Sequence, residues 1–304
     1  MKSAKYYLAA IVAFTIWGFF SLILKPIHEY NSLDILFYRV FSCGILMSVI
    51  AILFKRKAIV EAWDFFKQMN KSEKRRTILL NLGGTFFLVT NWFTFIYVMN
   101  HVSVKATSLA YLVCPILTTL LAYFILNEKL SKTQWLAVGL SCTGCVVLTY
   151  TSITDMLFSM AIGLSYACYL VSQRVNKGFD KFIILTFQIV MASLILVPFF
   201  QAYSGPVPTD VTFYFCIETI AIMFTIFPLF LNLYALSGIN SSTVGMLLNI
   251  NPMIAFALAL WVFQEPINEV QLVAYVIIFA AVLVFNQNFF VTIRKKRILM
   301  SKGN

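Results

Sequence analysis

Charged residues are scarce in this chain. Asp, Glu, Lys and Arg make up 12% of its 304 residues, half the share of about 25% that is usual in soluble domains. Hydrophobic residues reach 61%, and Phe alone contributes 30 positions. A soluble domain of this length cannot bury so much apolar surface. The composition therefore indicates an integral membrane protein.

Histidine is scarcer still, with only His28 and His101. The zinc-protease pattern His-Glu-x-x-His is absent, and so is the Gly-rich phosphate loop that ends in Gly-Lys-Ser/Thr. These absences disfavour a metal-dependent enzyme and a pump driven by ATP. A membrane-embedded lipid-modifying enzyme stays an alternative, although the 12 scattered carboxylates supply no obvious acidic site. A ligand-gated sensor or channel is the other alternative.

The six cysteines all lie in apolar stretches. Cys142 and Cys145 form a Cys-x-x-Cys pair, a spacing also found in redox and metal sites. A second such pair is missing, and the surrounding residues are those of a membrane helix. We therefore interpret both cysteines as packing residues and expect no cofactor and no metal ion.

Ten apolar runs come close to the length of about 20 residues that a helix needs to cross a bilayer. The first run is too long for the apolar core of a signal peptide and ends at Lys25-Pro26 without a cleavage site of small residues. We interpret it as a spanning helix. The predicted spans are residues 6–24, 33–54, 78–99, 104–126, 133–150, 153–171, 182–200, 211–235, 243–263 and 269–290.

Lys and Arg are distributed asymmetrically over the connections between these runs. Twenty fall on one side of the membrane, against only Lys25 and Lys105 on the other, while Arg39 lies inside the second run. Cytoplasmic loops carry the excess of Lys and Arg. Both termini are therefore predicted in the cytoplasm, with the protein in the plasma membrane, the bacterial inner membrane. The net charge of +11 follows from this topology and requires no nucleic-acid partner.

The long cytoplasmic loop at 55–77 has a helical pattern of its own. Ile59, Trp63 and Phe66 recur at helical spacing, with charged residues between them. This pattern favours a short helix on the inner membrane surface, and a partly ordered loop is the alternative. Residues 201–210 contain no Lys or Arg and are predicted to form an external loop.

The chain contains an internal repeat with a shift of 137 residues. Residues 97–137 and 234–274 share an outline of apolar helix, proline, acidic turn and second apolar helix. Matches at Pro, Glu and Gln carry weight, because these residues are scarce here. The identical positions are Tyr97/Tyr234, Pro115/Pro252, Leu121/Leu258, Ala122/Ala259, Glu128/Glu265, Gln134/Gln271 and Ala137/Ala274.

The repeat predicts a topology. Five spans per half is an odd number, so the second half must enter the membrane from the opposite side, and inverted repeats of this kind are typical of secondary transporters. We predict an all-α integral membrane fold, with ten transmembrane helices arranged as two inverted five-helix repeats. The first repeat covers residues 1–150, the second covers 151–293, and 294–304 form a basic cytoplasmic tail.

Several short motifs are specific enough to compare with known families. They are Thr15-Ile16-Trp17-Gly18-Phe19-Phe20, Leu33-Asp34-Ile35-Leu36-Phe37-Tyr38-Arg39, Asn91-Trp92, Tyr111-Leu112-Val113-Cys114-Pro115, Asn127-Glu128-Lys129, Gln134-Trp135-Leu136-Ala137, Thr225-Ile226-Phe227-Pro228-Leu229 and Asn251-Pro252. These motifs resemble the RarD group of EamA transporters, in the drug/metabolite transporter superfamily. Asn127-Glu128 and Gln264-Glu265 stand where that family more often has Gly-Glu.

The resemblance implies ten helices, termini inside, and a central cavity lined mainly by the first, third, fourth, sixth, eighth and ninth spans. It also implies a secondary transporter of small organic metabolites or drugs that works by alternating access. RarD-like proteins are associated with chloramphenicol sensitivity, and export is the direction we expect. We further expect a monomer in the lipid bilayer, with a proton as the candidate coupling ion.

Two charged residues fall inside the predicted spans. Arg39 is a candidate for binding an anionic substrate group, because a charge at this depth is costly and usually faces protein or a water-filled cavity. Its alternatives are pairing with Asp34 or Glu29, or snorkelling to the outer surface. Glu218 lies eight residues past Asp210, about 12 Å along its helix, and is a candidate for proton coupling. Its alternatives are a place near the outer interface or a pairing with Arg39.

Polar and aromatic residues on the helices expected at the centre complete the candidate substrate site. Such residues either line a site or form hydrogen bonds between helices. Tyr and Trp suit an organic, partly aromatic substrate. The candidates besides Arg39 are Trp17, Asn91, Trp92, Tyr97, Tyr111, Tyr166, Asn232, Asn249 and Asn251.

Pro115 and Pro252 occupy equivalent places in the two repeats. A proline inside a helix removes one backbone hydrogen bond and weakens the helix, and the freed carbonyl needs another partner within a membrane. We predict that the two prolines act as hinges for alternating access. Static kinks that only shape the cavity are the alternative.

Overall fold

The part of the chain that the structure describes is helical. The computed structural model describes residues 4–101, 104–149, 153–176, 178–262, 264 and 269–287, and these contain no β-strand. The first half contains α1 (Ala4–Gly18), α2 (Phe20–Leu24), η1 (Lys25–Ile27), α3 (Ser32–Phe54), α4 (Arg56–Gln68), α5 (Lys71–His101), α6 (Val104–Leu126) and α7 (Lys132–Thr149). The second half contains α8 (Ile153–Val175), α9 (Lys181–Tyr203), α10 (Val211–Ala221), the π-helical turn η2 (Ile222–Ile226), α11 (Phe227–Gly238), α12 (Ser241–Leu247), α13 (Ile250–Trp261) and α14 (Glu269–Phe285). The predicted tail at 294–304 lies outside the described residues.

Several helices have the length and composition of membrane spans. Five stretches qualify among the described residues: Ala4–Ile27, Ser32–Phe54, Lys71–Val98, Lys181–Tyr203 and Val211–Gly238. Shorter apolar helices cover Ala110–Leu126 and Leu272–Phe285. Large apolar side chains such as Phe54, 78% exposed, and Phe124, 71% exposed, point away from the protein interior. The chain is therefore a multi-pass membrane protein whose outer surface suits lipid.

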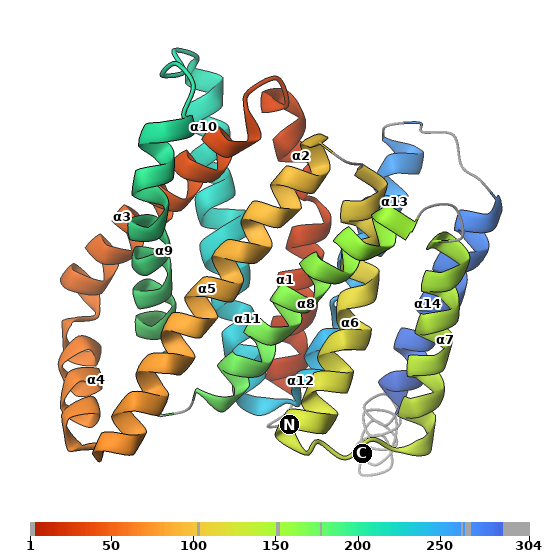
Figure 1. The fold of residues 1–304 in the computed structure, drawn as a ribbon, viewed down its shortest axis with the longest axis horizontal. Helices are drawn as coiled ribbons and strands as arrows, with labels where there is room; N and C mark the ends of the chain where they lie inside the picture. Colours follow the sequence, from red (N-terminus) through yellow and green to blue (C-terminus); the bar gives the residue numbers. More distant parts are fainter. Residues whose placement is uncertain are drawn as a thin grey trace, which may run out of the picture.

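The two ends of the bundle differ in charge. Figure 1 shows the start of α1, helix α4, and the turn between α6 and α7 at one end, and the connection between α9 and α10 at the other. The basic residues around α4 and the start of α5 lie at the first end. The segment that joins α9 to α10 at the second end lacks Lys and Arg.

The segment at 55–77 forms a helix and the start of the next one. Helix α4 occupies its first part, and α5 begins at Lys71. The Phe65 ring of α4 packs edge-on against Phe179, with 5.1 Å between ring centroids. Gly178, with a φ of 96°, makes room, since a Cβ there would lie 2.7 Å from the Phe65 ring. The predicted helix is thus present and the partly ordered loop is wrong, while its place on the membrane surface stays a prediction.

Small residues let helices from the two halves approach closely. A Cβ on Gly245 of α12 would lie 2.8 Å from Cβ of Thr118 on α6, and one on Gly144 of α7 would lie 2.6 Å from Ile278 of α14. Close approach at small residues is the usual way in which membrane helices pack, because lipid leaves little hydrophobic driving force between them. These contacts join α6 to α12 and α7 to α14.

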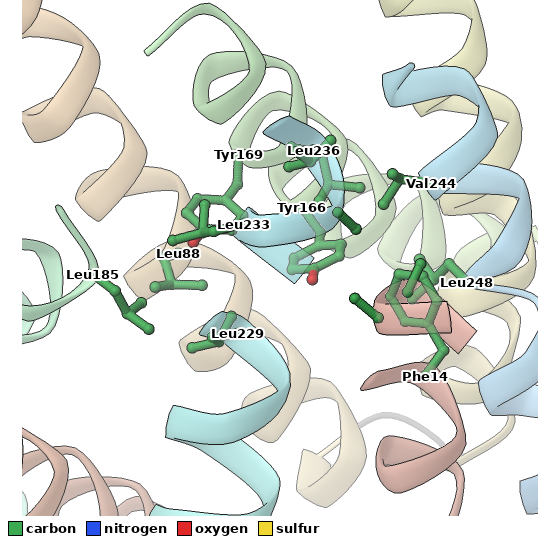
Figure 2. Packing of buried hydrophobic residues seen from close by; sticks show 14 of the residues in the cluster. Phe14, Leu88, Tyr166, Tyr169, Leu185, Leu229, Leu233, Leu236, Val244 and Leu248 are labelled. Atoms are coloured by element: carbon green, nitrogen blue, oxygen red, sulfur yellow. The ribbon is translucent and has the colours of Figure 1, made fainter. Parts of the chain in front are cut away.

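The largest cluster of buried apolar residues joins both halves. Within the described residues it brings together side chains of α1, α3, α5, α6, α8, α9, α10, α11 and α12. Figure 2 shows the rings of Tyr166 and Tyr169 among side chains that include Phe14 and Leu233. Aromatic hydroxyl groups therefore lie within this apolar cluster.

Candidate functional site

Two breaks interrupt the helices of the second half. Pro228 has no amide hydrogen, so the carbonyl of Phe224, four residues earlier, loses its helical partner, and the π-helical turn η2 lies there. The indole N–H of Trp17 donates to this carbonyl at 2.7 Å. A side chain from another helix thus satisfies a backbone group that lipid cannot. This hydrogen bond ties α1 to the break between α10 and α11.

Trp17 also begins a chain of contacts through the interior. Its ring lies 6.1 Å from that of Tyr166, in an edge-on arrangement. The Tyr166 hydroxyl accepts a hydrogen bond from Nδ2 of Asn232 at 3.0 Å. Asn232 is completely buried, and its Oδ1 has no hydrogen-bond partner among the described residues. Three of the predicted site residues therefore meet, and one retains a free acceptor.

Arg39 lies inside α3. The side chain of Asn31 caps this helix by accepting the Leu33 amide at 3.0 Å, and Arg39 follows eight residues later, about 12 Å along the axis. Its Cζ lies 5.1 Å from the centroid of the Trp92 ring on α5. The Tyr111 ring of α6 packs against Phe95, which follows Trp92 by one turn of α5. We therefore group Arg39, Trp92 and Tyr111 as the second part of the candidate site.

Asp34 of α3 and Glu218 of α10, two of the acidic partners suggested for Arg39, form hydrogen bonds with other residues. Asp34 accepts hydrogen bonds from the Gly205 amide at 3.1 and 3.3 Å. Glu218, on the exposed side of α10, accepts a hydrogen bond from the hydroxyl of Ser42. Within the described residues no carboxylate, Glu29 included, lies within 4.0 Å of the Arg39 guanidinium.

The second break separates α12 from α13. Asn249 lies in it, is fully buried, and donates through Nδ2 to the carbonyl of Met246 at 3.2 Å. Its Oδ1 has no hydrogen-bond partner in the described part of the chain. Asn251 is 8% exposed, and its backbone N–H donates to the carbonyl of Leu248 at 3.1 Å. Pro252 cannot donate to this carbonyl, because it has no N–H. Helix α6, in contrast, runs through Pro115 without a break.

Two predicted residues have their contacts outside the groups described so far. Asn91 is buried but donates to the Ile162 carbonyl at 2.9 Å and the Ser165 hydroxyl at 3.3 Å, so it links α5 to α8. Tyr97 is 46% exposed, and its ring stacks on that of Phe93 with 6.3 Å between centroids.

A network of buried amides was missed by the sequence analysis. Asn81 Oδ1 accepts from Asn176 Nδ2 at 2.9 Å and from Gln188 Nε2 at 3.5 Å. Gln188 Nε2 also donates to Gln173 Oε1 at 3.1 Å. All four residues are at most 9% exposed. The sequence signal for this network was the presence of Asn and Gln within apolar runs. In the structure the four side chains connect α5, α8 and α9.

Polar side chains inside an apolar helical bundle often mark the pathway of a substrate or an ion. The two halves each match the model of the EamA-like transporter family, over residues 4–150 and 154–287. The chain therefore belongs to this family.

Relatives of the same length support the assignment. The uncharacterized transporter YojE of Bacillus subtilis (strain 168) is 26% identical over 277 residues, which cover 90% of this chain and 91% of YojE. Protein RarD of Escherichia coli (strain K12) is 24% identical over 294 residues, which cover 95% and 96% of the two chains. These relatives confirm the resemblance to RarD. A solved crystal structure shares the fold, with a TM-score of 0.73 at 13% identity over 94% of this chain and 98% of that one.

Proposed function

We propose that this protein is a secondary transporter that exports small organic metabolites or drugs by alternating access. Ten spanning segments would form two inverted five-helix repeats, with the substrate between them. The protein would act as a monomer in the bacterial inner membrane, with both termini in the cytoplasm and without a cofactor.

The pairing of helices between the halves carries this proposal. Under the 137-residue shift, α7 corresponds to α14 and α6 to α12 and α13. Helix α7 packs on α14, and α6 packs on α12. In the order of the spans, α1 corresponds to α8, and α5 corresponds to α10 with α11. The contact between α1 and α11 therefore has its counterpart in that between α8 and α5. Contacts that recur in this way are expected if a two-fold axis in the membrane plane relates two inverted halves.

The helices that contribute the candidate residues support this proposal. Trp17, Arg39, Trp92, Tyr111, Tyr166 and Asn232 come from six different segments, four in the first half and two in the second. Substrate sites of transporters built from inverted repeats lie near the midplane, at the interface of the repeats, beside interrupted helices. The breaks at η2 and between α12 and α13 supply such interruptions.

Glu218 is the proposed coupling residue. Its carboxyl group and its partner Ser42 join α10 of the second half to α3 of the first. A carboxyl at a helix contact between the halves can take up a proton in one state and lose it in the other, and intramembrane acids serve as proton relays in transporters. Glu218→Gln should abolish stimulation of transport by an imposed pH gradient, while Asp64→Gln, on exposed α4, should not.

Cysteine accessibility tests the topology on which the proposal depends. Single cysteines are placed at Lys71 and Gly205, which lie at opposite ends of the bundle, in a background without the six native cysteines. An impermeant maleimide added to intact cells should label the cysteine at 205 and spare the one at 71. Labelling of position 71 from outside would contradict the inverted-repeat topology.

A further inference from the structure

Arg39 is a cation without a counter-charge in the described structure. The donor Nε is buried and has no hydrogen-bond partner, and the nearest acids of α3 and α10 are held by Gly205 and Ser42. An arginine inside a membrane helix is costly unless it is paired or faces a water-filled cavity. A residue of this kind needs a partner that the described chain does not supply.

The surroundings of Arg39 limit what that partner can be. Cζ of the Arg39 guanidinium lies over the Trp92 ring, 5.1 Å from its centroid, and Nε of Arg39 donates no hydrogen bond to any described residue. A guanidinium edge matches the two oxygens of a carboxylate or phosphate and binds them through parallel hydrogen bonds. Tyr111 of α6 adds an aromatic surface beside α5, since its ring packs against Phe95, one turn after Trp92, with 5.5 Å between ring centroids.

We propose that Arg39, Trp92 and Tyr111 bind the anionic group of a small organic acid, and that organic anions are the substrate class of this protein. The inference rests on the proposed transport function and narrows it. Arg39 binds the anionic group of the ligand, and the aromatic side chains contact the apolar part of the ligand. An anionic lipid headgroup offers the same chemistry, so the experiment must distinguish the two sources.

Binding to the purified full-length protein tests the proposal. The protein in phosphatidylcholine nanodiscs is titrated with benzoate, cinnamate, indole-3-acetate and 4-hydroxyphenylacetate, each beside its neutral amide. A ligand that binds only the folded protein raises the unfolding temperature by mass action. We expect at least one acid to bind at least tenfold more tightly than its amide.

Variants connect this preference to Arg39. Arg39→Gln should bind the acid and its amide equally, and Arg39→Lys should keep part of the preference. Arg76→Gln, which removes an exposed cation at the start of α5, should keep all of it. The proposal is wrong if no acid binds better than its amide, or if Arg39→Gln keeps the preference. If Arg39→Gln does not fold, the proposal is still tested by the affinities of the wild-type protein and of Arg39→Lys for each acid and its amide.

Two further outcomes separate the proposal from its alternatives. Loss of the acid preference in phosphatidylglycerol nanodiscs would show that a lipid headgroup occupies Arg39, and would overturn the proposal. Binding needs no transport. A clear acid preference without any movement of solute through proteoliposomes would therefore support this site and contradict the proposed function alone.

Discussion

Asn127 and Gln264 share a left-handed backbone conformation, with φ of 53° and 51°, and are the non-glycine residues with positive φ among those described. They lie 137 residues apart, which is the shift of the internal repeat. Each follows the proline-containing helical segment of its half. Glycine adopts this conformation without steric cost, whereas other side chains are strained in it. The two halves therefore share this backbone conformation at equivalent positions.

This conformation makes Gln264→Gly a stabilising substitution. A side chain in the left-handed region costs about 1 kcal/mol, and Asn tolerates it better than Gln. We expect Gln264→Gly to raise the unfolding temperature of the purified protein by about 2 °C, and Asn127→Gly to raise it less. A lower unfolding temperature for Gln264→Gly would contradict the strain that we assign to this turn.

Glu128 joins the two halves at the end of the bundle that holds α4. Its carboxylate accepts hydrogen bonds from the amides of Ser241 and Ser242 at 2.9 and 3.1 Å, and from the Ser242 hydroxyl at 2.6 Å. It thus caps α12, where a negative charge is favourable. Glu128→Ala should lower the free energy of unfolding by about 1–2 kcal/mol. Glu61→Gln, on exposed α4, serves as control, and an equal effect of both would contradict the cap.

Two adjacent glycines of α5 offer a matched test of the amide network. A Cβ on Gly84 would lie 2.5 Å from Gln173 Nε2 and 3.0 Å from Gln188 Nε2, whereas one on Gly83 would meet nothing within 4 Å. Ala favours a helix over Gly by about 1 kcal/mol. Gly83→Ala should therefore stabilise the protein, and Gly84→Ala should destabilise it by about 1–3 kcal/mol. Thermal unfolding of both variants measures the difference, and similar shifts would show that the network tolerates displacement.

The two repeat-related prolines should respond differently to substitution. Pro115 lies inside continuous α6, where Pro115→Ala restores a backbone hydrogen bond. Pro252 lies in the first turn of α13, where proline costs little, so Pro252→Ala should leave stability unchanged. If both act as hinges, each variant should shift the labelling of single cysteines in the inner and outer vestibules, in opposite directions. If labelling is unchanged and transport is intact in both variants, the prolines are static kinks that only shape the cavity.

The sequence predicted the elements better than the direction of their side chains. Apolar length and charged ends locate membrane helices directly, and the pattern around Trp63 predicted α4. Tyr97 shows the limit. Lipid and protein interior are both apolar, so a membrane helix carries no amphipathic pattern to show which face is buried, and Tyr97 is 46% exposed.

Contacts between residues distant in the sequence could not be predicted either. The hydrogen bond from Trp17 to the Phe224 carbonyl spans 207 residues, and that from Gln188 to Asn81 spans 107. Periodicity and local spacing carry no information about such pairs. Arg39 was recognised because a lone charge in an apolar run is visible without its neighbours. Its contact with Trp92 required the packing of α3 on α5.

Transport of small organic solutes is tested most directly with purified protein in liposomes that are loaded with a bacterial metabolite extract. Mass spectrometry of the lumen follows each solute over time, with protein-free liposomes as control. We predict that at least one small organic solute leaves the protein-containing liposomes faster, chemically unchanged, at a rate that saturates with concentration. Release of no solute, a rate that does not saturate, or conversion of a solute into a new compound would contradict a secondary transporter.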